Sequence, residues 1–388
     1  MNKATPHGWQ QRSISELVTL QYGKSPKDVI DVDGKYPIIG TGGITGNSNA
    51  YLHEGGTSVV GRKGTINKPS YVDEKFWAID TTYYGENYKQ SEPKWFFYNL
   101  QNTDLAKYNE ASGVPSLNRD TLYSISLNVP PLPEQKKIAS ILTSVDEVIE
   151  KTESQIAKLQ DLKTGMMQEL LTKGIGHSEF KDSPVGRIPV GWGIETIGKI
   201  FSLQLGKMLS KAAKVGDSPL PYLGNKNIQW DRVDLTHLEQ MDFSERERKK
   251  YSLRFGDLLM CEGGDVGRCA IWRDEMTACY YQKAIHRLRP IDDLYHPVLL
   301  LEYMKFAKQR NLLVNFVSQT SIAHLTREKL STIPIPVPPK DEQSRIVDIS
   351  VGIENKILKC SERRKKLGDY KKALMQDLLT GKVRVQTD

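Results

Sequence analysis

Two glycine-containing segments resemble loops that bind phosphate groups, but neither has the surroundings that such loops need. Gly40-Thr41-Gly42-Gly43-Ile44-Thr45-Gly46 follows a strand-like segment. A nucleotide-binding fingerprint continues into a helix, whereas Asn47-Ser48-Asn49-Ala50-Tyr51 is typical of a loop. Gly23-Lys24-Ser25 matches the end of a P-loop, but Val18 stands where the earlier glycine is required. We therefore expect a turn here, or a loop whose backbone approaches a binding partner closely, and no nucleotide site.

Fragments of other catalytic motifs are also incomplete. Asn128-Val129-Pro130-Pro131-Leu132 is close to the Asn-Pro-Pro-aromatic element of adenine methyltransferases, but Val129 interrupts it and no aromatic residue follows. Asp73-Glu74-Lys75 contains an acid-x-Lys fragment of the kind found in nucleases, which arises readily by chance on a charged surface. The seven histidines are scattered, and Cys261 and Cys269 lack the second close pair of a zinc site. The sequence predicts no catalytic residue and no metal site, and a single-chain DNA methyltransferase or nuclease is kept as an alternative.

The composition is typical of a water-soluble protein with more than one domain. A chain of 388 residues is long enough for two or three domains that each bury a core. The 54 Lys and Arg exceed the 47 Asp and Glu, and the net charge of +7 slightly favours a polyanionic partner. The four cysteines include no CxxC pair and fit a reducing compartment. No apolar run approaches the roughly 18 residues of a membrane span. We expect a cytoplasmic protein with no membrane partner.

The chain contains the same two segments twice. Val129-Pro130-Pro131-Leu132-Pro133-Glu134-Gln135 recurs as Val337-Pro338-Pro339-Lys340-Asp341-Glu342-Gln343. Met167-Gln168-Glu169-Leu170-Leu171-Thr172 recurs as Met375-Gln376-Asp377-Leu378-Leu379-Thr380. The offset is 208 residues in both cases, so the stretch between the two segments has one length in both copies. A long element whose length is kept twice indicates a spacer.

The repeated stretches have the heptad spacing of paired helices. Each predicted helix has about 40 residues and is roughly 60 Å long, and Gly174 and Gly381 near the ends are stop signals. Lys163 and Lys371 occupy equivalent places among the polar interruptions of the apolar seam. We expect the two helices to pack together as an antiparallel coiled coil. The seam residues are Ile138, Leu142, Val145, Ile149, Ile156, Leu159, Met166, Leu170, Ile346, Ile353, Ile357, Leu367, Leu374 and Leu378.

The regions that precede the two helices also resemble each other. Gly8-Trp9 matches Gly191-Trp192, and Leu20-Gln21-Tyr22-Gly23-Lys24 matches Leu203-Gln204-Leu205-Gly206-Lys207. Short alternating runs punctuated by glycine predict strands joined by tight loops, with a few helices. We therefore expect two pseudo-symmetric α+β domains separated by the two long helices. Because the pattern behaves like a ring that is cut once, we also expect the two termini to lie close together.

The boundaries follow from these repeats. We expect a first domain at residues 1–130, a spacer helix at 131–174, a linker at 175–190, a second domain at 191–336, and a second spacer helix at 337–382 with a tail to 388. Helices inside the two domains are expected at residues 92–100 and 296–311.

This arrangement resembles the specificity (S) subunit of type I restriction-modification enzymes. The resemblance covers nearly the whole chain and depends on the two Pro-Pro-x-x-Glu-Gln segments and on Pro184-Val185-Gly186-Arg187-Ile188-Pro189-Val190-Gly191-Trp192. It implies that each α+β region is a target-recognition domain that reads half of a split site on double-stranded DNA. It also implies that the helices set the spacing and dock two modification subunits, through which restriction subunits join. S-adenosylmethionine, ATP and magnesium would then belong to those partners, with no cofactor in this chain.

Candidate DNA contacts are side chains that can reach phosphates or base edges from the predicted loops. For any one of them, the alternative is an ordinary solvated side chain, and a protein-interaction scaffold without a DNA role is kept as an alternative function. The candidates are Lys24, Asn47, Arg62, Lys63 and Arg119 in the first domain, and Lys207, Asn225, Lys226, Arg268, Gln319 and Arg327 in the second.

Overall fold

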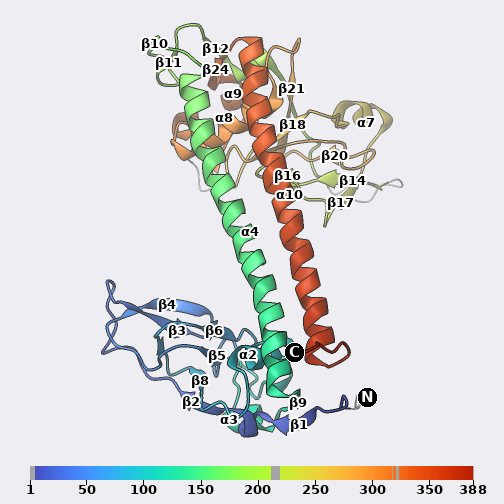
Figure 1. Cartoon of the computed structure of the whole chain (residues 1–388). Coiled ribbons are helices and arrows are strands. Elements are labelled where there is room, and N and C mark those ends of the chain that lie inside the picture. Colours follow the sequence, from blue (N-terminus) through green and yellow to red (C-terminus); the bar gives the residue numbers. More distant parts are fainter. Residues whose placement is uncertain (1–4, 211–218, 317, 320–322, 388) are drawn as a thin grey trace. The chain divides into compact units, whose positions relative to one another are not determined.

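The computed structural model describes residues 5–210, 219–316, 318–319 and 323–387, which form two compact units. Unit 1 consists of Met1–Gln155 and Cys360–Asp388, and unit 2 consists of Ile156–Lys359. Each unit therefore contains one α+β region and a part of each of the two long helices, α4 (Leu132–Lys173) and α10 (Lys340–Leu379). Figure 1 shows α4 in green and α10 in red.

The α+β region of unit 1 contains two small sheets. The four-stranded sheet has the order β2-β8-β5-β6 and the three-stranded sheet the order β4-β3-β7. A further pair, β1 with β9, joins the two ends of the region immediately before α4. The strands are β1 (Gln10–Ser13), β2 (Thr19–Tyr22), β3 (Tyr36–Gly40), β4 (Gly43–Ser48), β5 (Thr57–Gly61), β6 (Ser70–Val72), β7 (Trp77–Ala78), β8 (Thr82–Glu86) and β9 (Ser126–Val129). The helices are α1 (Ile14–Leu17), α2 (Pro93–Asn102), η1 (Leu105–Tyr108) and α3 (Arg119–Ser124).

Unit 2 repeats this plan. Its four-stranded sheet has the order β13-β21-β18-β19, its three-stranded sheet the order β17-β14-β20, and β12 pairs with β24 just before α10. The strands are β10 (Phe180–Lys181), β11 (Ile188–Pro189), β12 (Gly193–Thr196), β13 (Phe201–Leu205), β14 (Pro219–Leu223), β15 (Ile228–Gln229), β16 (Arg232–Val233), β17 (Glu239–Asp242), β18 (Leu258–Cys261), β19 (Cys269–Ile271), β20 (Tyr280–Tyr281), β21 (Ile285–Pro290), β22 (Ser318–Gln319), β23 (Ala323–His324) and β24 (Pro334–Val337). The helices are α5 (Ile197–Ile200), η2 (Asn225–Asn227), α7 (Glu245–Tyr251), α8 (Pro297–Gln309), η3 (Val314–Phe316) and α9 (Arg327–Thr332).

In each unit, the main core joins the α+β region to both long helices. In unit 1, Ile138 and Leu142 of α4 and Leu378 of α10 belong to one apolar cluster with the buried face of α2. In unit 2, Leu171 of α4 and Ile346 of α10 belong to the corresponding cluster with α8. Burial of each such side chain contributes about 1.5–3 kcal/mol. The packing therefore fixes each α+β region against a two-helix platform.

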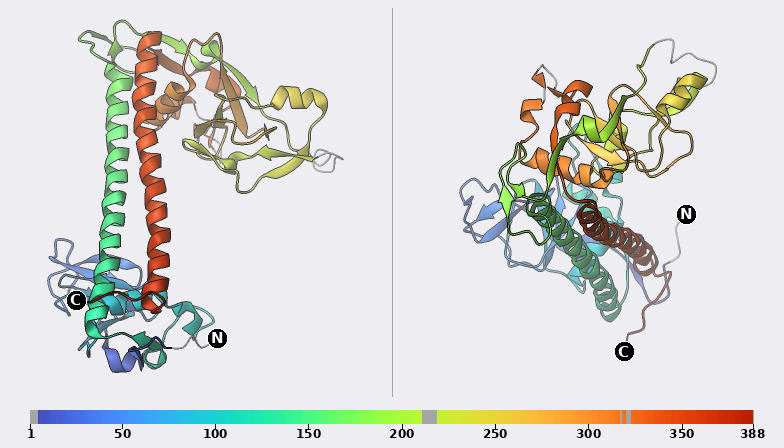
Figure 2. Two further views of the ribbon diagram at one scale, coloured as in Figure 1. Left: turned by 45° about the vertical axis from the view of Figure 1, so that its right-hand side comes forward. Right: turned by 90° about the horizontal axis from the view of Figure 1, so that it is seen from above.

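The two long helices run antiparallel in both units. In unit 1, ion pairs join Asp146 to Lys371 and Glu153 to Arg364, so the α10 number falls as the α4 number rises. In unit 2, Lys163 pairs with Glu354, and Leu171 shares the core with Ile346, so the α10 number again falls as the α4 number rises. The helices have 42 and 40 residues, and Figure 2 shows them side by side in two further views. The predictions of an α+β chain, of two long helices and of their antiparallel pairing are confirmed.

The helix ends also follow the sequence. Gly174 directly follows α4 with a φ of 63°, and Gly381 lies just beyond α10 with a φ of 69°, which is the left-handed backbone of a helix stop. Helices α2 and α8 confirm the two shorter helices expected near residues 92–100 and 296–311. No helix within the described ranges is both long and apolar enough to cross a membrane.

Candidate nucleic-acid interface

In unit 1, the ends of two strands and the start of one helix bring basic side chains together. Strands β2 and β5 are both antiparallel to β8, so their carboxyl ends lie at the same edge of the sheet. Lys24 follows β2, Arg62 and Lys63 follow β5, and Arg119 begins α3. The loop before α3 is hydrogen-bonded to the Arg62 carbonyl at 2.8 Å. We call Lys24, Arg62, Lys63 and Arg119 the first basic cluster.

Tyr22 makes cation–π contacts with two arginines of this cluster. The ring of Tyr22, which is 43% exposed, has its centroid 4.9 Å from the guanidinium carbon of Arg119 and 5.3 Å from that of Arg62. Cation–π contacts of this kind contribute about 0.5–1 kcal/mol at exposed sites, which opposes the repulsion between the two arginines. No carboxylate of the described residues forms an ion pair with the cluster. Its positive charge is therefore free to meet an anionic partner.

Asn47 lies apart from the first basic cluster. It stands on β4 opposite Pro37, at the far end of the β3–β4 hairpin from its turn, and its side chain donates to the Val32 carbonyl at 3.3 Å. The turn itself is formed by the glycine-rich segment, in which Gly40 pairs with Gly43. The segment therefore forms a turn, which is one of the two expectations from its sequence.

In unit 2, the two candidate lysines are paired with acids of the same unit. Lys207 follows β13 as Lys24 follows β2, and its Nζ lies 2.7 Å from an oxygen of Glu247. Lys226 Nζ lies 3.1 Å from Glu239 Oε1. A DNA phosphate would have to replace these carboxylates, so these two lysines are less available to an anionic partner than the lysines of the first basic cluster.

The other four candidates of unit 2 lie in different settings. Arg268, directly before β19, donates to the Asn225 carbonyl at 2.9 Å, and Asn225 Nδ2 donates to the Gly263 carbonyl at 3.1 Å. These two side chains connect loops within the unit. Arg327 is exposed at the first turn of α9, after the N-cap Thr326, and Gln319 belongs to β22.

The glutamate of each repeated Pro-Pro-x-x-Glu-Gln segment closes the junction between helix and α+β region. In unit 1, Trp9 Nε1 donates to Glu134 Oε2 at 3.1 Å, and Arg384 donates to both oxygens of Glu134, at 2.7 and 2.8 Å. Arg384 also donates to the His7 carbonyl at 2.7 Å. The described segments next to the two termini therefore meet, as the sequence predicts.

Unit 2 builds the same junction from the interior of the chain. Trp192 Nε1 donates to Glu342 Oε2 at 2.9 Å, and His177 Nε2 lies 3.0 Å from each oxygen of Glu342. A Cβ on Gly174 would collide with Glu342 and with the rings of His177 and Trp192, and the φ of Gly174 is 63°, so this position favours glycine. The paired glutamines, Gln135 and Gln343, each donate to two carbonyls and accept the backbone N–H at the N-cap of α2 or α8. These contacts give a physical reason for the Gly-Trp and Glu-Gln repeats.

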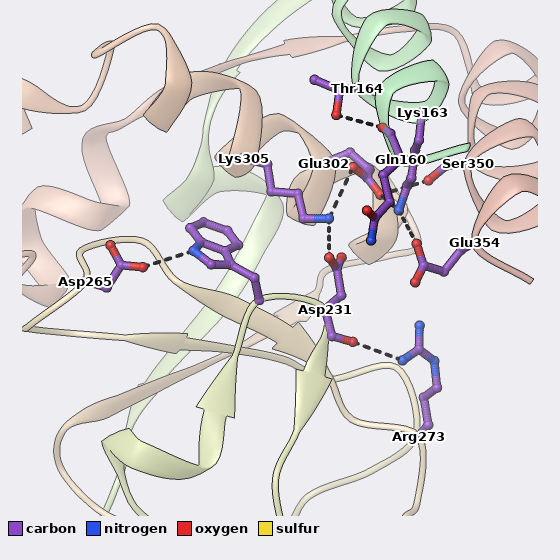
Figure 3. Close-up of polar contacts among 11 residues, drawn as sticks. Gln160, Lys163, Thr164, Asp231, Asp265, Arg273, Glu302, Lys305, Ser350 and Glu354 are labelled. Carbon is purple, nitrogen blue, oxygen red and sulfur yellow. Dashed lines mark hydrogen bonds and ion pairs between the residues drawn. The ribbon is translucent and has the colours of Figure 1, made fainter. Parts of the chain in front are cut away.

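A buried ionic network joins three helices in unit 2, as Figure 3 shows. Lys163 Nζ of α4 lies 2.9 Å from Glu302 Oε1 of α8 and 2.7 Å from Glu354 Oε2 of α10. Ser350 Oγ donates to Glu302 Oε1 at 2.8 Å. Burial disfavours the charge of Lys163, but the two carboxylates outweigh that effect and raise its pKa. The network therefore fixes the register of α4 on α10 and the position of α8 on both.

The equivalent lysine of unit 1 is less enclosed. Lys371 Nζ lies 2.7 Å from Asp146 Oδ1, and Tyr98 OH of α2 donates to Asp146 Oδ2 at 2.9 Å. The side chain of Lys371 is 17% exposed and that of Asp146 is 27% exposed, against 10% for Lys163 and 5% for Glu302. The ion pairs of Lys163 and Lys371 thus lie at equivalent places, but the Lys163 pair is more deeply buried.

Comparison with known proteins assigns this layout to a family. The sequence profile described as "Type I restriction modification DNA specificity domain" matches residues 6–161 and residues 189–365. The chain belongs to this family. The prediction of a type I specificity subunit is therefore confirmed, and the subunit contains two copies of the domain.

Relatives and solved structures agree with this assignment. The type I restriction enzyme MjaVIII specificity subunit of Methanocaldococcus jannaschii is 27% identical, with 98% of this chain and 94% of that protein aligned. The EcoBI specificity subunit of Escherichia coli is 22% identical over 74% of this chain and 65% of its own length. The crystal structure of the S subunit of a type I restriction-modification system from M. genitalium has the same fold, with a TM-score of 0.66, 17% identity and 98% of both chains covered.

The predicted seam residues of this specificity subunit all lie on covered faces. Every one of the fourteen is buried or half-buried. Met167 and Leu171 were missed, although they are more deeply buried than the predicted Met166 and Leu170, because they face the core of unit 2. Whether the seam also docks partner subunits stays a prediction. No group of three or more potential metal ligands lies close together in the described part of the chain.

Two further residues that the sequence did not single out support the recognition loops of the specificity subunit. Tyr83 OH donates to the Leu117 carbonyl at 3.2 Å, and in unit 2 His286 Nε2 lies 3.0 Å from the Leu325 carbonyl. Burial raises the pKa of Tyr83 to about 12, so its hydroxyl stays a donor. Tyr83 and His286 occupy matching places on β8 and β21, but only the histidine can gain a proton near neutral pH.

This histidine makes the stability of unit 2 sensitive to acid. A carbonyl only accepts, so Nε2 of His286 carries the proton, and Nδ1 is buried without a partner among the described residues. Burial lowers the pKa of His286, despite the nearby Glu262 and Glu328, with Arg327 also close. Because the unfolded histidine binds its proton at the higher pH, the free energy of unfolding falls as pH drops below about 6.5, by up to roughly 1.4 kcal/mol per pH unit.

We expect His286→Gln to remove this part of the acid sensitivity between pH 7 and pH 5, measured by urea unfolding at each pH. Glutamine keeps a donor for the Leu325 carbonyl and does not titrate. His237→Gln, at an exposed site, is the matched control and should leave the pH dependence unchanged. Equal pH profiles for His286→Gln and the unmodified chain would contradict the assignment.

Proposed function

We propose that this specificity subunit reads a bipartite, asymmetric site on double-stranded DNA, one half with each α+β region. The observation that supports this most directly is the pair of matching loop frameworks that carry unlike side chains. The first basic cluster has no acidic partners among the described residues, whereas Lys207 and Lys226 of unit 2 are paired. Two unlike readers in one chain select two unlike half-sites, which two identical readers would not.

The long helices take two roles in this proposal. Both continue from one unit into the other, so their length sets the gap between the half-sites. Two modification subunits dock on the helical region, and restriction subunits join through them. S-adenosylmethionine, ATP and magnesium belong to those partners, and the complex works in the cytoplasm.

The proposal keeps the domain boundaries derived from the sequence. The two target-recognition domains are residues 1–130 and 191–336, the spacer helices lie within 131–174 and 337–382, and 175–190 is the linker. Phosphate contacts fix a protein on the duplex without reading sequence. We assign that role to the lysines after β2, β5 and β13 and to the arginines that begin α3 and α9. These residues are Lys24, Lys63, Lys207, Arg119 and Arg327.

Neutralising the first basic cluster tests the DNA role. In Lys24→Gln/Arg62→Gln/Lys63→Gln/Arg119→Gln, the three residues assigned to phosphate lose their charge together with Arg62, and each lost phosphate contact contributes about 0.9 to the slope of log affinity against log salt. We expect the three assigned contacts to make the slope shallower by up to about 2.7, measured by fluorescence anisotropy on a non-cognate duplex from 50 to 300 mM NaCl. Thermal unfolding checks that the variant is folded.

A matched control separates the cluster from net charge. Lys35→Gln/Lys89→Gln/Lys107→Gln/Lys137→Gln removes four exposed charges of unit 1 that lie outside the cluster. This variant should keep most of the slope. If both variants lose the same slope, or if the unmodified subunit with its modification subunits shows no salt-dependent binding, the proposed DNA interface is wrong.

A further inference from the structure

The residue directly after β5 in unit 1 and the residue directly after β18 in unit 2 have the same backbone environment. In unit 1 this residue is Arg62, and its carbonyl accepts the N–H of Leu117 at 2.8 Å. In unit 2 it is Glu262, whose carbonyl accepts the N–H of Leu325 at 2.7 Å. The N–H of each donates to the residue immediately before β8 or β21, at 2.8 and 2.9 Å. The two frameworks therefore present side chains of opposite charge at one equivalent place.

Other members of the two loop clusters are shared and do not distinguish the half-sites. Lys24 and Lys207 follow equivalent strands, and Arg119 and Arg327 both begin the short helix after the matching leucine. A residue common to both readers fits a contact common to both halves, such as phosphate. A difference in sequence preference has to come from positions where the two α+β regions carry different side chains. At this position one region has the cationic Arg62 and the other has the anionic Glu262.

The side chain of Arg62 is positioned for recognition. Its Nη1 donates to the Asp80 carbonyl at 3.2 Å, and its guanidinium lies over the Tyr22 ring. These two contacts hold the plane of the group and leave its other donors unused among the described residues. A guanidinium with free parallel donors matches the O6 and N7 acceptors of guanine in the major groove.

Glu262 has the opposite chemistry. Within the described ranges, its carboxylate has neither a hydrogen-bond donor nor a cation as partner. A carboxylate beside a duplex is repelled by phosphate, so at a recognition position it is useful only against a base that offers a donor. A carboxylate accepts and cannot donate, which suits the N4 amino group of cytosine.

We propose that this position determines specificity in both units, with Arg62 reading a guanine in one half-site and Glu262 reading a cytosine in the other. The proposal rests on the proposed DNA role and adds the identity of one base in each half. One consequence is that an exchange of charge at either position changes one half-site and leaves the other unchanged.

The test is selection from duplexes with randomised positions, using the full chain in complex with its modification subunits. We expect Arg62→Gln to lower the preference for guanine at one position of one half-site by about 5- to 150-fold, the range of one good bidentate pair. Glu262→Gln should lower the preference for cytosine at one position of the other half-site. Glutamine matches the N6 and N7 atoms of adenine, so we expect adenine to gain at both positions.

Matched variants and the unmodified complex separate the possible failures. Lys107→Gln and Glu245→Gln remove one exposed charge of each sign from the same units and should leave both half-sites unchanged. If the unmodified complex selects no sequence, the proposed function fails. If it selects a split site in which Arg62→Gln or Glu262→Gln changes no single base preference, or in which the selected bases are not guanine and cytosine, the present inference fails and the DNA role stands.

Discussion

Replacing Lys163 with methionine is expected to lower the free energy of unfolding by about 3–5 kcal/mol, the usual effect of removing one partner from a buried ionic group. The substitution leaves Glu302 and Glu354 close together with no lysine between them. Glu302 is only 5% exposed, and among the described residues it keeps one longer ion pair, at 3.8 Å to Lys305. The loss should be measured by urea unfolding at pH 7, followed by circular dichroism and tryptophan fluorescence.

Two further variants distinguish charge from packing. Lys371→Met, at the equivalent but more exposed place in unit 1, should cost about 1 kcal/mol or less. Replacing the whole trio with Lys163→Met/Glu302→Leu/Glu354→Leu should restore stability to within about 1 kcal/mol of the unmodified chain, because no uncompensated charge remains in that trio. If Lys163→Met and Lys371→Met lower the free energy of unfolding equally, the difference in burial between the two ion pairs does not determine their effect on stability.

Lengthening both long helices together is expected to widen the gap between the half-sites by one to two base pairs. Four residues inserted between Gln155 and Ile156 of α4, and four between Ser361 and Glu362 of α10, keep the antiparallel register on both sides. The insertion adds about 6 Å of helix and is a stutter that a coiled coil absorbs by local unwinding. A base-pair step is about 3.4 Å. The selected sites of the complex should show both half-sites unchanged and a longer gap.

Insertion into α4 alone is the control. It displaces Lys163 by about one turn relative to Glu354, so we expect a less stable protein and no clean widening of the gap. If the paired insertion changes the bases of either half-site, or leaves the gap unaltered, the helices do not set the spacing.

The helical part of the fold could be predicted because its signals are local and repeated. The proline before each Glu-Gln pair, the heptad spacing and the glycine stops fix the start, the seam and the end of α4 and α10. The carboxylates that form ion pairs with Lys163 could not be predicted from a local pattern, because Glu302 lies on a helix of the α+β region far along the chain. Met167 and Leu171 were missed because a heptad pattern marks only the side chains that face the partner helix, whereas these two face the core of unit 2.

The recognition loops were partly predictable for a similar reason. The repeated Leu-Gln-x-Gly-Lys segment led to Lys24 and Lys207, and it also contains Tyr22, whose role depends on arginines from other loops. The sequence indicated Arg268 as a candidate contact and did not single out Glu262, but the backbone hydrogen bonds align Glu262 with Arg62, and Arg268 lies directly before β19. Loop lengths differ between the two regions, so only the pairing of strands could fix this correspondence.

The two glutamate junctions differ in how the chain connects the residues that form them. His177 and Trp192, which contact Glu342, lie on one short stretch of the chain, whereas Trp9 and Arg384, which contact Glu134, come from opposite ends of the described chain. Both glutamates nevertheless hold a tryptophan and a basic or histidine side chain in the same way. A short peptide connection between the two contacting segments is therefore not required to form such a junction, because contacts with one carboxylate can hold the segments together.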